Sequence, residues 1–145
     1  MKSLTLAVLF AVSLAIAASA KPSSTLVKWH GHAAFEIVAP NGLVLLIDPW
    51  LNNPTNPAAR GSDPVAALKR VDYILVTHGH FDHIGDAVAI AKKTKAKLVA
   101  NFELGQNMAR LLDYPADQMG FETLMNSGGE ISLAGGAVAV QMTAA

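Results

Sequence analysis

The feature that most constrains this chain is a dense run of metal-capable side chains at the end of an apolar segment. The stretch T-H-G-H-F-D-H-I-G-D occupies residues 77–86 and follows the apolar run Y-I-L-V of residues 73–76. It places His78, His80, Asp82 and His83 within six positions and holds three of the five histidines of the chain. A lone histidine is more often an ordinary core or surface residue, but this interleaved cluster after a strand predicts a metal site.

The spacing of these residues explains how they can share ions. In an extended segment, side chains two positions apart point the same way and their Cα atoms lie about 6.6–7 Å apart, so His78 and His80 can lean toward one ion. Gly79 removes the Cβ that would crowd the turn. Asp82 and His83 come where the chain bends into the next helix, so their side chains can diverge toward a second ion. Two-metal hydrolytic sites have about 3.5–4 Å between the ions.

Two acidic residues near the turn also have simpler interpretations. Asp82 suits the N-cap of a helix that starts near Ile84, alone or in addition to a metal-binding role. Asp86 falls in the first turn of that helix, where a negative charge interacts favourably with the helix dipole. We interpret Asp86 as structural.

Hydrophobic periodicity and turn residues predict a mixed α/β unit. Strands are expected at 25–30, 33–39, 43–47, 72–76, 97–101, 121–125, 130–133 and 137–142. Helices are expected at 63–70, 84–93 and 103–112, and an irregular loop rich in proline and asparagine at 48–62. The chain therefore begins with strands, continues with two strand–helix units and ends with strands.

Residues 1–20 have the pattern of a secretory signal peptide. Met1 and Lys2 precede an apolar run over residues 4–18, and Ala18-Ser19-Ala20 offers the small residues that a signal peptidase accepts. The run is shorter than the roughly 20 apolar residues that span a bilayer, which argues against a stable membrane anchor. We expect cleavage near Ala20, a periplasmic or secreted location, and one domain over residues 21–145.

Charge and cysteine content restrict the partners and the metal. The chain carries 11 basic and 11 acidic residues, so bulk charge does not attract polyanions and no nucleic-acid partner is expected. It contains no cysteine, so a metal site must use nitrogen and oxygen donors. Zinc is the default ion for such a nitrogen-rich site, with manganese and iron as alternatives.

Longer stretches around the histidine turn resemble a known family. H-G-H-F-D-H fits the H-x-H-x-D-H signature of the metallo-β-lactamase superfamily. The stretches W-H-G-H-A-A-F-E-I, L-L-I-D-P-W-L-N-N-P and V-T-H-G-H-F-D-H-I-G-D resemble its branch of metal-dependent hydrolases related to the ascorbate-6-phosphate lactonases. N-F-E-L at 101–104 and M-N-S-G-G at 125–129 are also similar to that branch, so the likeness extends from residue 27 to about residue 143.

The resemblance implies an αββα sandwich of two similar halves, of which this chain carries roughly the first. It implies that His78 and His80 hold one divalent ion and that Asp82 and His83 hold a second, with Asp82 also catalytic. A hydroxide bridging the ions would attack an ester, lactone, amide or phosphodiester. Flavodi-iron relatives carry a glutamate at the position of His80, so this histidine favours hydrolysis over electron transfer.

The same resemblance implies further ligands that this sequence does not contain. The family uses another His, a bridging Asp and a last His, and we expect these beyond Ala145 because no histidine follows His83. We interpret the chain as a fragment or truncated reading frame of an active hydrolase. The alternatives are an inactive remnant that binds one metal, or a chain that assembles with a second chain. Half a sandwich leaves an apolar sheet face uncovered, which predicts poor solubility or self-association.

Two further residues are candidates for the site. Asp48 closes an apolar strand before Pro49 and either forms the turn or orients a histidine ligand, and the resemblance places this Asp-Pro pair beside the metal centre. His32 follows Gly31 and either lines the site or is a strand-end residue with a satisfied ring.

The sequence thus predicts an exported metal-dependent hydrolase that acts on a small molecule. One alternative is a non-catalytic metal-binding or scavenging protein that uses only the cluster at residues 78–83. Another is a β-lactamase that acts on antibiotics.

Overall fold

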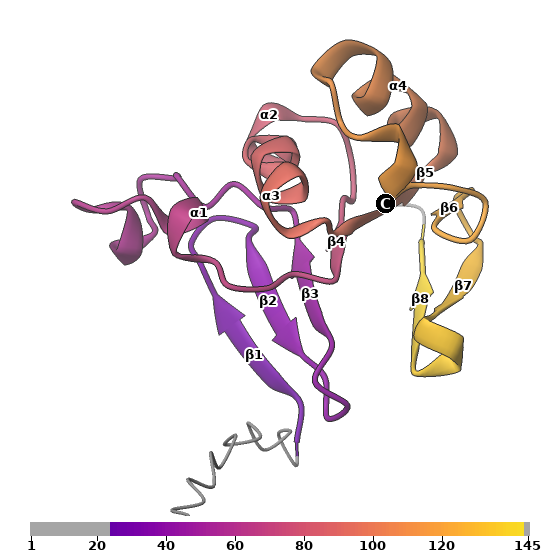
Figure 1. Cartoon of the computed structure of the whole chain (residues 1–145), viewed down its shortest axis with the longest axis horizontal. Helices are drawn as coiled ribbons and strands as arrows, with labels where there is room; N and C mark the ends of the chain where they lie inside the picture. Colours follow the sequence, from indigo (N-terminus) through magenta and orange to yellow (C-terminus); the bar gives the residue numbers. More distant parts are fainter. Residues whose placement is uncertain (1–23, 144–145) are drawn as a thin grey trace, which may run out of the picture.

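A computed structural model describes residues 24–143, and the expected signal peptide lies outside this range. Six strands form one sheet in the order β1-β2-β3-β4-β5-β6 (Figure 1). The first three strands pair antiparallel and the last four pair parallel, so the pairing changes at β3. The strands are β1 Leu26–Trp29, β2 Phe35–Val38, β3 Val44–Ile47, β4 Tyr73–Leu75, β5 Lys97–Asn101 and β6 Leu124–Met125.

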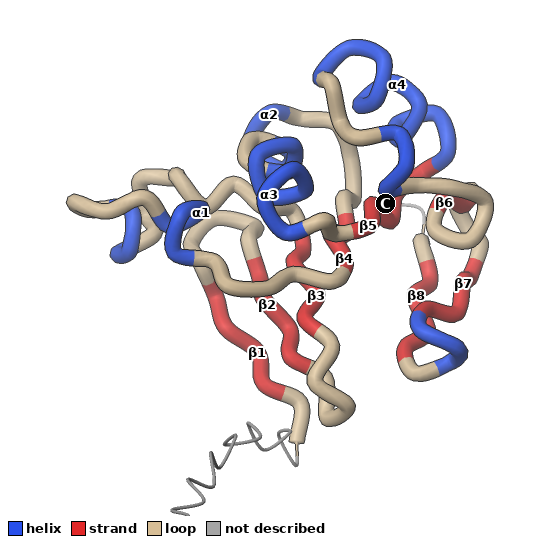
Figure 2. Tube along the Cα trace, viewed as in Figure 1, coloured by secondary structure: helices blue, strands red, loops and turns tan. Residues whose placement is uncertain are grey.

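The helices lie together on one side of this sheet (Figure 2). They are α1 Pro64–Ala67, α2 Phe81–Ile84, α3 Ala87–Thr94 and α4 Phe102–Leu112. Side chains from α1, α3 and α4 pack on the sheet in one buried cluster, which includes Val65, Ile90, Met108, Leu46 and Ile74. Within residues 24–143, none of the helices combines the length and apolar character that crossing a bilayer requires.

A hairpin packs on the opposite face of the sheet. Its strands, β7 Glu130–Leu133 and β8 Val138–Gln141, form a separate antiparallel two-stranded sheet. A second buried cluster joins it to the large sheet through Leu45, Val99, Met125 and Leu133. The layers are therefore helices, a six-stranded sheet and the start of a second sheet, which confirms the expected α/β class.

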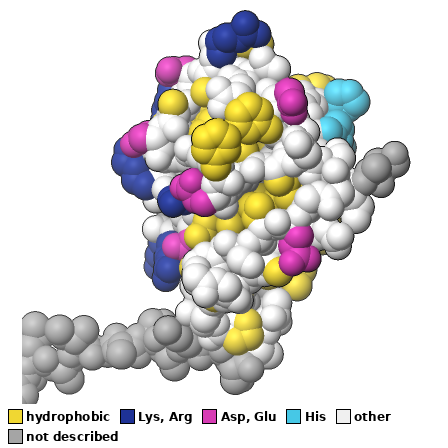
Figure 3. Space-filling view, turned by 90° about the vertical axis from the view of Figure 1, so that its right-hand side faces the viewer, with side chains coloured by type: hydrophobic (Ala, Val, Ile, Leu, Met, Phe, Trp, Pro, Cys, Tyr) yellow, Lys and Arg dark blue, Asp and Glu magenta, His cyan; other side chains and the backbone are white. Residues whose placement is uncertain are grey.

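The second sheet covers its neighbour incompletely. Cavities of about 260 Å³ and 440 Å³ lie along β8, between the hairpin and strands of the large sheet. Figure 3 looks at the side that carries α4 and the hairpin, and it shows hydrophobic side chains across the middle of this face. Phe121 on this face is 87% exposed.

Most expected elements are present, but three differ in extent. The helix expected at 84–93 is two helices separated at Gly85 and Asp86, because the backbone N–H of Asp86 donates to Pro49 rather than continuing the helix. The helix expected at 63–70 ends at Ala67, because Leu68 takes an extended backbone conformation. The strand expected at 121–125 is reduced to β6, because residues 120–123 form a turn closed by Gly120.

Candidate metal centre

The histidine turn lies at the carboxyl end of β4, beside the end of β3. Because these two strands are parallel, their carboxyl ends meet at the same edge of the sheet. Asp48 follows β3 and Thr77 lies just beyond β4, so the two residues face each other across this edge. The chain then turns through His78 and His80 into α2, which carries Asp82 and His83.

Asp48 connects the two strand ends to the histidines. Its carboxylate, which is 4% exposed, accepts from the backbone N–H of Thr77 at 2.8 Å and from the Thr77 hydroxyl at 2.7 Å. It also accepts from Nδ1 of His83 at 2.9 Å. A carboxylate that holds one ring nitrogen directs the other nitrogen of the same ring toward a metal. The structure therefore places Asp48 where it orients His83.

The same network assigns the tautomer of His78. The Thr77 hydroxyl has one hydrogen and donates it to Asp48, since a carboxylate only accepts. The 3.0 Å contact between Thr77 Oγ1 and Nδ1 of His78 therefore has His78 as the donor. A neutral ring that donates from Nδ1 keeps a lone pair on Nε2, and this assignment follows from the hydrogen-bond network. Nε2 of His78 accordingly accepts from Nδ1 of His80 at 2.9 Å.

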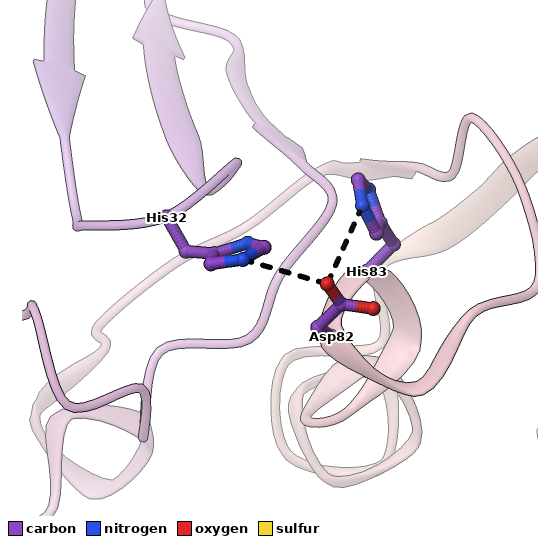
Figure 4. Close-up of side chains that lie close together, drawn as sticks. All are labelled: His32, Asp82 and His83. Atoms are coloured by element: carbon purple, nitrogen blue, oxygen red, sulfur yellow. Dashed lines mark ion pairs between the residues drawn. The ribbon is translucent and has the colours of Figure 1, made fainter.

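The side chains at the site form two groups, and His83 lies next to both. One group is His78 with His80, and the other is Asp82 with His32. The ring centroids of His78 and His83 are 4.0 Å apart, so His83 does not diverge from the first pair as expected. Asp82 does turn away, and its Oδ2 lies 3.9 Å from Nε2 of His83 and 3.4 Å from Nε2 of His32 (Figure 4). His32, Asp82 and His83 each offer one donor atom, and these atoms all lie within 4.8 Å of one another.

These separations fit a divalent ion. Nitrogen and oxygen ligands lie about 2.0–2.2 Å from zinc, so two ligands at a tetrahedral angle are about 3.4 Å apart and two at a right angle about 3.0 Å. The 3.4 Å between Nε2 of His32 and Oδ2 of Asp82 falls on the tetrahedral value. All donors are nitrogen or oxygen. The assignment of particular ligands to particular ions stays a prediction.

The position of Asp82 differs from one interpretation of the sequence. The N-cap of α2 is His80, and Asp82 lies inside the first turn. Its side chain is therefore available to the cluster. Asp86 is the N-cap residue of α3, and its side chain has a structural role because it binds the neighbouring loop. Its carboxylate accepts from the backbone N–H of Asn52 at 2.8 Å and from the Asn52 amide at 3.0 Å.

Sequence reasoning missed the asparagines of the 48–62 loop. Asn53 and Asn56 are both buried, and each binds backbone carbonyls: Asn53 those of His30 and Trp50, Asn56 that of Leu51. The signal was present, because asparagine amides repeatedly replace backbone partners in irregular loops. The Pro-Asn composition indicates a surface loop, and much of the loop is exposed, but its buried asparagines also build a hydrogen-bonded support under the site.

An aromatic wall borders the cluster. The ring of Phe81 packs edge-on against Trp50 at 5.5 Å between centroids, and Trp50 packs edge-on against His32 at 5.4 Å. Phe81 is 71% exposed although it lies between His80 and Asp82. The site thus has polar donors on one side and an accessible apolar surface beside them.

Comparisons with known proteins agree with this arrangement. The sequence profile of the metallo-beta-lactamase superfamily matches residues 27–139. A UPF0173 metal-dependent hydrolase of Anaeromyxobacter dehalogenans is 52% identical over 132 residues, which cover 87% of this chain and 46% of that protein. One from Thermodesulfovibrio yellowstonii is 50% identical over 117 residues, which cover 81% of this chain and 43% of that protein. The chain thus spans less than half the length of these curated relatives.

Solved structures show the same fold. Igni18, a metallo hydrolase from Ignicoccus hospitalis, superposes with a TM-score of 0.63 at 30% identity, over 78% of this chain and 44% of that one. The chemotaxis sensor ODP, solved as a peroxy diiron species, has a TM-score of 0.50 at 21% identity and shows a likeness of fold alone. With its profile match, its layered sheets and its histidine turn, this chain belongs to the metallo-β-lactamase superfamily.

Proposed function

We propose that this chain carries the first metal-binding half of a metal-dependent hydrolase. The observation that supports it most directly is the hydrogen-bond network of Asp48 and Thr77. It leaves lone pairs on the Nε2 atoms of His78 and His83, and Nε2 of His83 lies 3.9 Å from the carboxylate of Asp82. Neutral imidazoles oriented by a carboxylate are the arrangement that metal-binding histidines require.

The proposed ligand groups follow the positions of the side chains. His78 and His80 hold one ion, and Asp82 and His83 hold a second. Zinc is our first choice, with manganese or iron as alternatives, because the donor set is nitrogen and oxygen. In such sites divalent ions make water a stronger nucleophile at neutral pH and polarise the carbonyl or phosphoryl group under attack.

The protein residues supply orientation and proton handling. Asp48 keeps the proton of His83 on Nδ1, so that Nε2 faces the site. Thr77 fixes the ring of His78 in the same way, through its hydroxyl. Asp82 is partly exposed, and we assign its carboxylate the additional role of accepting a proton from water during the reaction.

We propose a small ester, lactone, amide or phosphodiester as the substrate. Its uncharged part would lie on the wall of Phe81 and Trp50, which the solvent reaches beside the donors. The sequence resemblance favours the branch related to the ascorbate-6-phosphate lactonases. The histidine pair at 78 and 80, which implies hydrolytic rather than redox chemistry, supports the same choice.

The remaining ligands of the hydrolase belong to the part of the relatives that this chain does not span. A cavity of about 260 Å³ is lined by Thr77 from the site and by Met142 and Thr143 after β8. The described end of the chain thus lies close to the histidine turn.

We also propose two properties of the isolated chain. It is exported through its N-terminal segment, and it self-associates through the apolar surface around the hairpin.

The test separates metal binding from turnover. Metal content of the purified chain is measured by elemental analysis for the unchanged protein and for His80→Ala. Turnover of a lactone and phosphodiester panel is measured on a chimera in which the remainder of the Anaeromyxobacter dehalogenans relative follows residue 143. We expect stoichiometric metal in the chain and turnover in the chimera, both reduced by His80→Ala.

Other outcomes distinguish the rival functions. Metal binding without any turnover by the chimera, when the intact relative is active on the panel, would indicate a scavenging protein. Hydrolysis of a chromogenic cephalosporin in preference to the panel would indicate a β-lactamase. A chain without stoichiometric metal would overturn the proposal entirely.

A further inference from the structure

A hydrogen-bonded clasp of Asn53 and Thr55 holds the turn between β1 and β2. Asn53, which is 0% exposed, donates from its amide to the carbonyls of His30 at 2.9 Å and Trp50 at 2.6 Å. Its carbonyl oxygen accepts from the backbone N–H of Thr55 at 2.9 Å and from the Thr55 hydroxyl at 2.7 Å. The Thr55 oxygen in turn accepts from the backbone N–H of His32 at 2.9 Å. Asn53 and Thr55 thus link the loop of residues 48–62 to the turn that carries His32.

The clasp leaves this turn little freedom. Gly31 has a φ of +85°, and a Cβ there would lie 2.5 Å from Oδ1 of Asn53 and 2.6 Å from the Thr55 hydroxyl. His32 itself has a φ of 48°, a left-handed conformation that is unfavourable for a residue with a side chain. Such strain persists only where the surrounding structure enforces it, and it is concentrated at functional sites.

The enforced conformation brings His32 to the metal cluster. Figure 4 shows its ring directed at the carboxylate of Asp82, which comes from α2, fifty positions later in the chain. The distance from Nε2 to Oδ2 is 3.4 Å, and the ring lies edge-on to His83 at 5.9 Å between centroids. His32 therefore adds a second nitrogen donor beside Asp82, in addition to that of His83.

The separations distinguish His32 from an ordinary neighbour. With ligands about 2.0–2.2 Å from an ion at tetrahedral angles, donor atoms lie about 3.4 Å apart. His32 and Asp82 already have this separation, and Nε2 of His83 lies 3.9 Å from the same carboxylate oxygen. The three donor atoms all lie within 4.8 Å of one another, close enough to share one ion.

We propose that His32 is a third protein ligand of the ion held by Asp82 and His83, and that Asn53 and Thr55 are the residues that position it. The proposal rests on the metal-binding part of the proposed function, and it requires no hydrolysis. It follows that this chain alone supplies three donors to that ion. An ion at the other pair, His78 and His80, receives only two from the cluster.

The test uses Co²⁺ as a spectroscopic probe of the purified chain. Titration followed by the d–d absorption gives affinity, and NMR of the Co²⁺ form counts the shifted ring N–H signals of the ligating histidines. For the ion held by Asp82 and His83, we expect His32→Ala to remove one shifted signal. It should weaken binding at least as much as the loss of a residue that only orients a ligand, which typically costs about 10- to 100-fold. His83→Ala should remove a different shifted N–H signal.

A second pair of variants isolates the positioning role. Thr55→Val removes the oxygen that accepts from His32 and should weaken Co²⁺ binding by about tenfold, the lower end of that range. Thr55→Ser retains the oxygen and should restore the affinity. A merely structural role for Thr55 would lower the melting temperature without changing the shifted His32 signal.

The outcomes separate this proposal from the proposed function. If His83→Ala and His80→Ala weaken binding but His32→Ala changes neither the affinity nor the signals, His32 is not a ligand and the metal site stands. If the unchanged chain binds no Co²⁺, both proposals fall. If His32→Ala weakens binding without loss of a shifted signal, His32 acts only by its contact with Asp82 and the ligand assignment is wrong.

Discussion

Nδ1 of His83 and Oδ2 of Asp48 lie 2.9 Å apart, although 35 positions separate the two residues in the chain. Parallel pairing of β3 with β4 produces this proximity, since it brings Asp48 beside the residue that opens the histidine turn. Asp48 also has a φ of 44°, so its backbone is held in a left-handed conformation that few residues adopt. The relationship makes Asp48 the first residue to change when the metal site is tested.

Asp48→Asn should weaken metal binding while the fold is kept. Asparagine tolerates the left-handed conformation as well as aspartate does, but its neutral amide cannot accept all three hydrogen bonds from Thr77 and His83. Loss of such an orienting partner typically lowers metal affinity by about 10- to 100-fold. Competition with a zinc chelator measures the affinity. Asp117→Asn, an exposed acid outside the site, is the control and should bind as the unchanged chain does.

Gly31→Ala should destabilise the protein more than Gly61→Ala. Both glycines have a positive φ, so both substitutions incur the left-handed penalty of about 1–2 kcal/mol. Only at Gly31 does the new Cβ meet other atoms, whereas nothing lies within 4 Å of one at Gly61. Overpacking adds about 1–3 kcal/mol at Gly31. Urea denaturation gives both free energies of unfolding, and equal losses would show that the turn moves freely away from Asn53.

Asp86→Ala should lower the free energy of unfolding by about 1–2 kcal/mol, since it removes the acceptor of two hydrogen bonds from Asn52. Asp86→Asn keeps one accepting oxygen and should lose less. Thermal denaturation compares the two with Asp117→Ala. A loss in Asp117→Ala as large as that in Asp86→Ala would contradict a specific role for the Asn52 contacts.

Glu36→Gln should remove a pH-dependent part of the stability. The hydrogen bond from His30 at 3.1 Å holds the pKa of Glu36 below its ordinary value of 4.5; the charges of His30 and Lys28 add to this, and burial opposes it. A carboxyl with a lowered pKa in the folded state stabilises the fold above the unfolded value, and this stability is lost as the pH falls through the folded value.

The unchanged chain should therefore exceed Glu36→Gln in stability most clearly above pH 4.5. The difference should shrink as the pH is lowered further. Urea denaturation of both proteins across this range provides the measurement. A difference that stays constant with pH would mean that ionisation of Glu36 contributes nothing to folding.

Much of the fold was predictable from local patterns. The buried strand before the histidine turn, the Asp63-Pro64 start of α1 and the Pro40-Asn41-Gly42 turn each follow from residues that are adjacent in sequence. Short-range rules suffice there because the periodicity of apolar residues and the preferences of Pro, Gly and Asn act within a few positions. The H-x-H-x-D-H signature located the histidine turn for the same reason, because its residues lie within six positions of one another.

Contacts between residues that are far apart in the chain were harder to predict from the sequence. His32 was only one of several candidates, because nothing near it in sequence shows that its turn packs against α2. The break between α2 and α3 was missed, because it depends on the carbonyl of Pro49, which is remote in the chain. Both features arise from tertiary packing, which overrides the local preference for one continuous helix.

The left-handed backbone of His32 has a consequence for how this protein responds to selection. Glycine at this position would relieve the strain, and loss of the exposed imidazole leaves no buried hydrogen-bond donor without its acceptor. A screen that rewards yield or heat tolerance alone would therefore enrich variants that have discarded the imidazole. Asp48 differs, because glycine there would leave the donors of Thr77 and His83 without their buried acceptor. Robustness and chemistry are thus opposed at position 32, and laboratory evolution must select for both together.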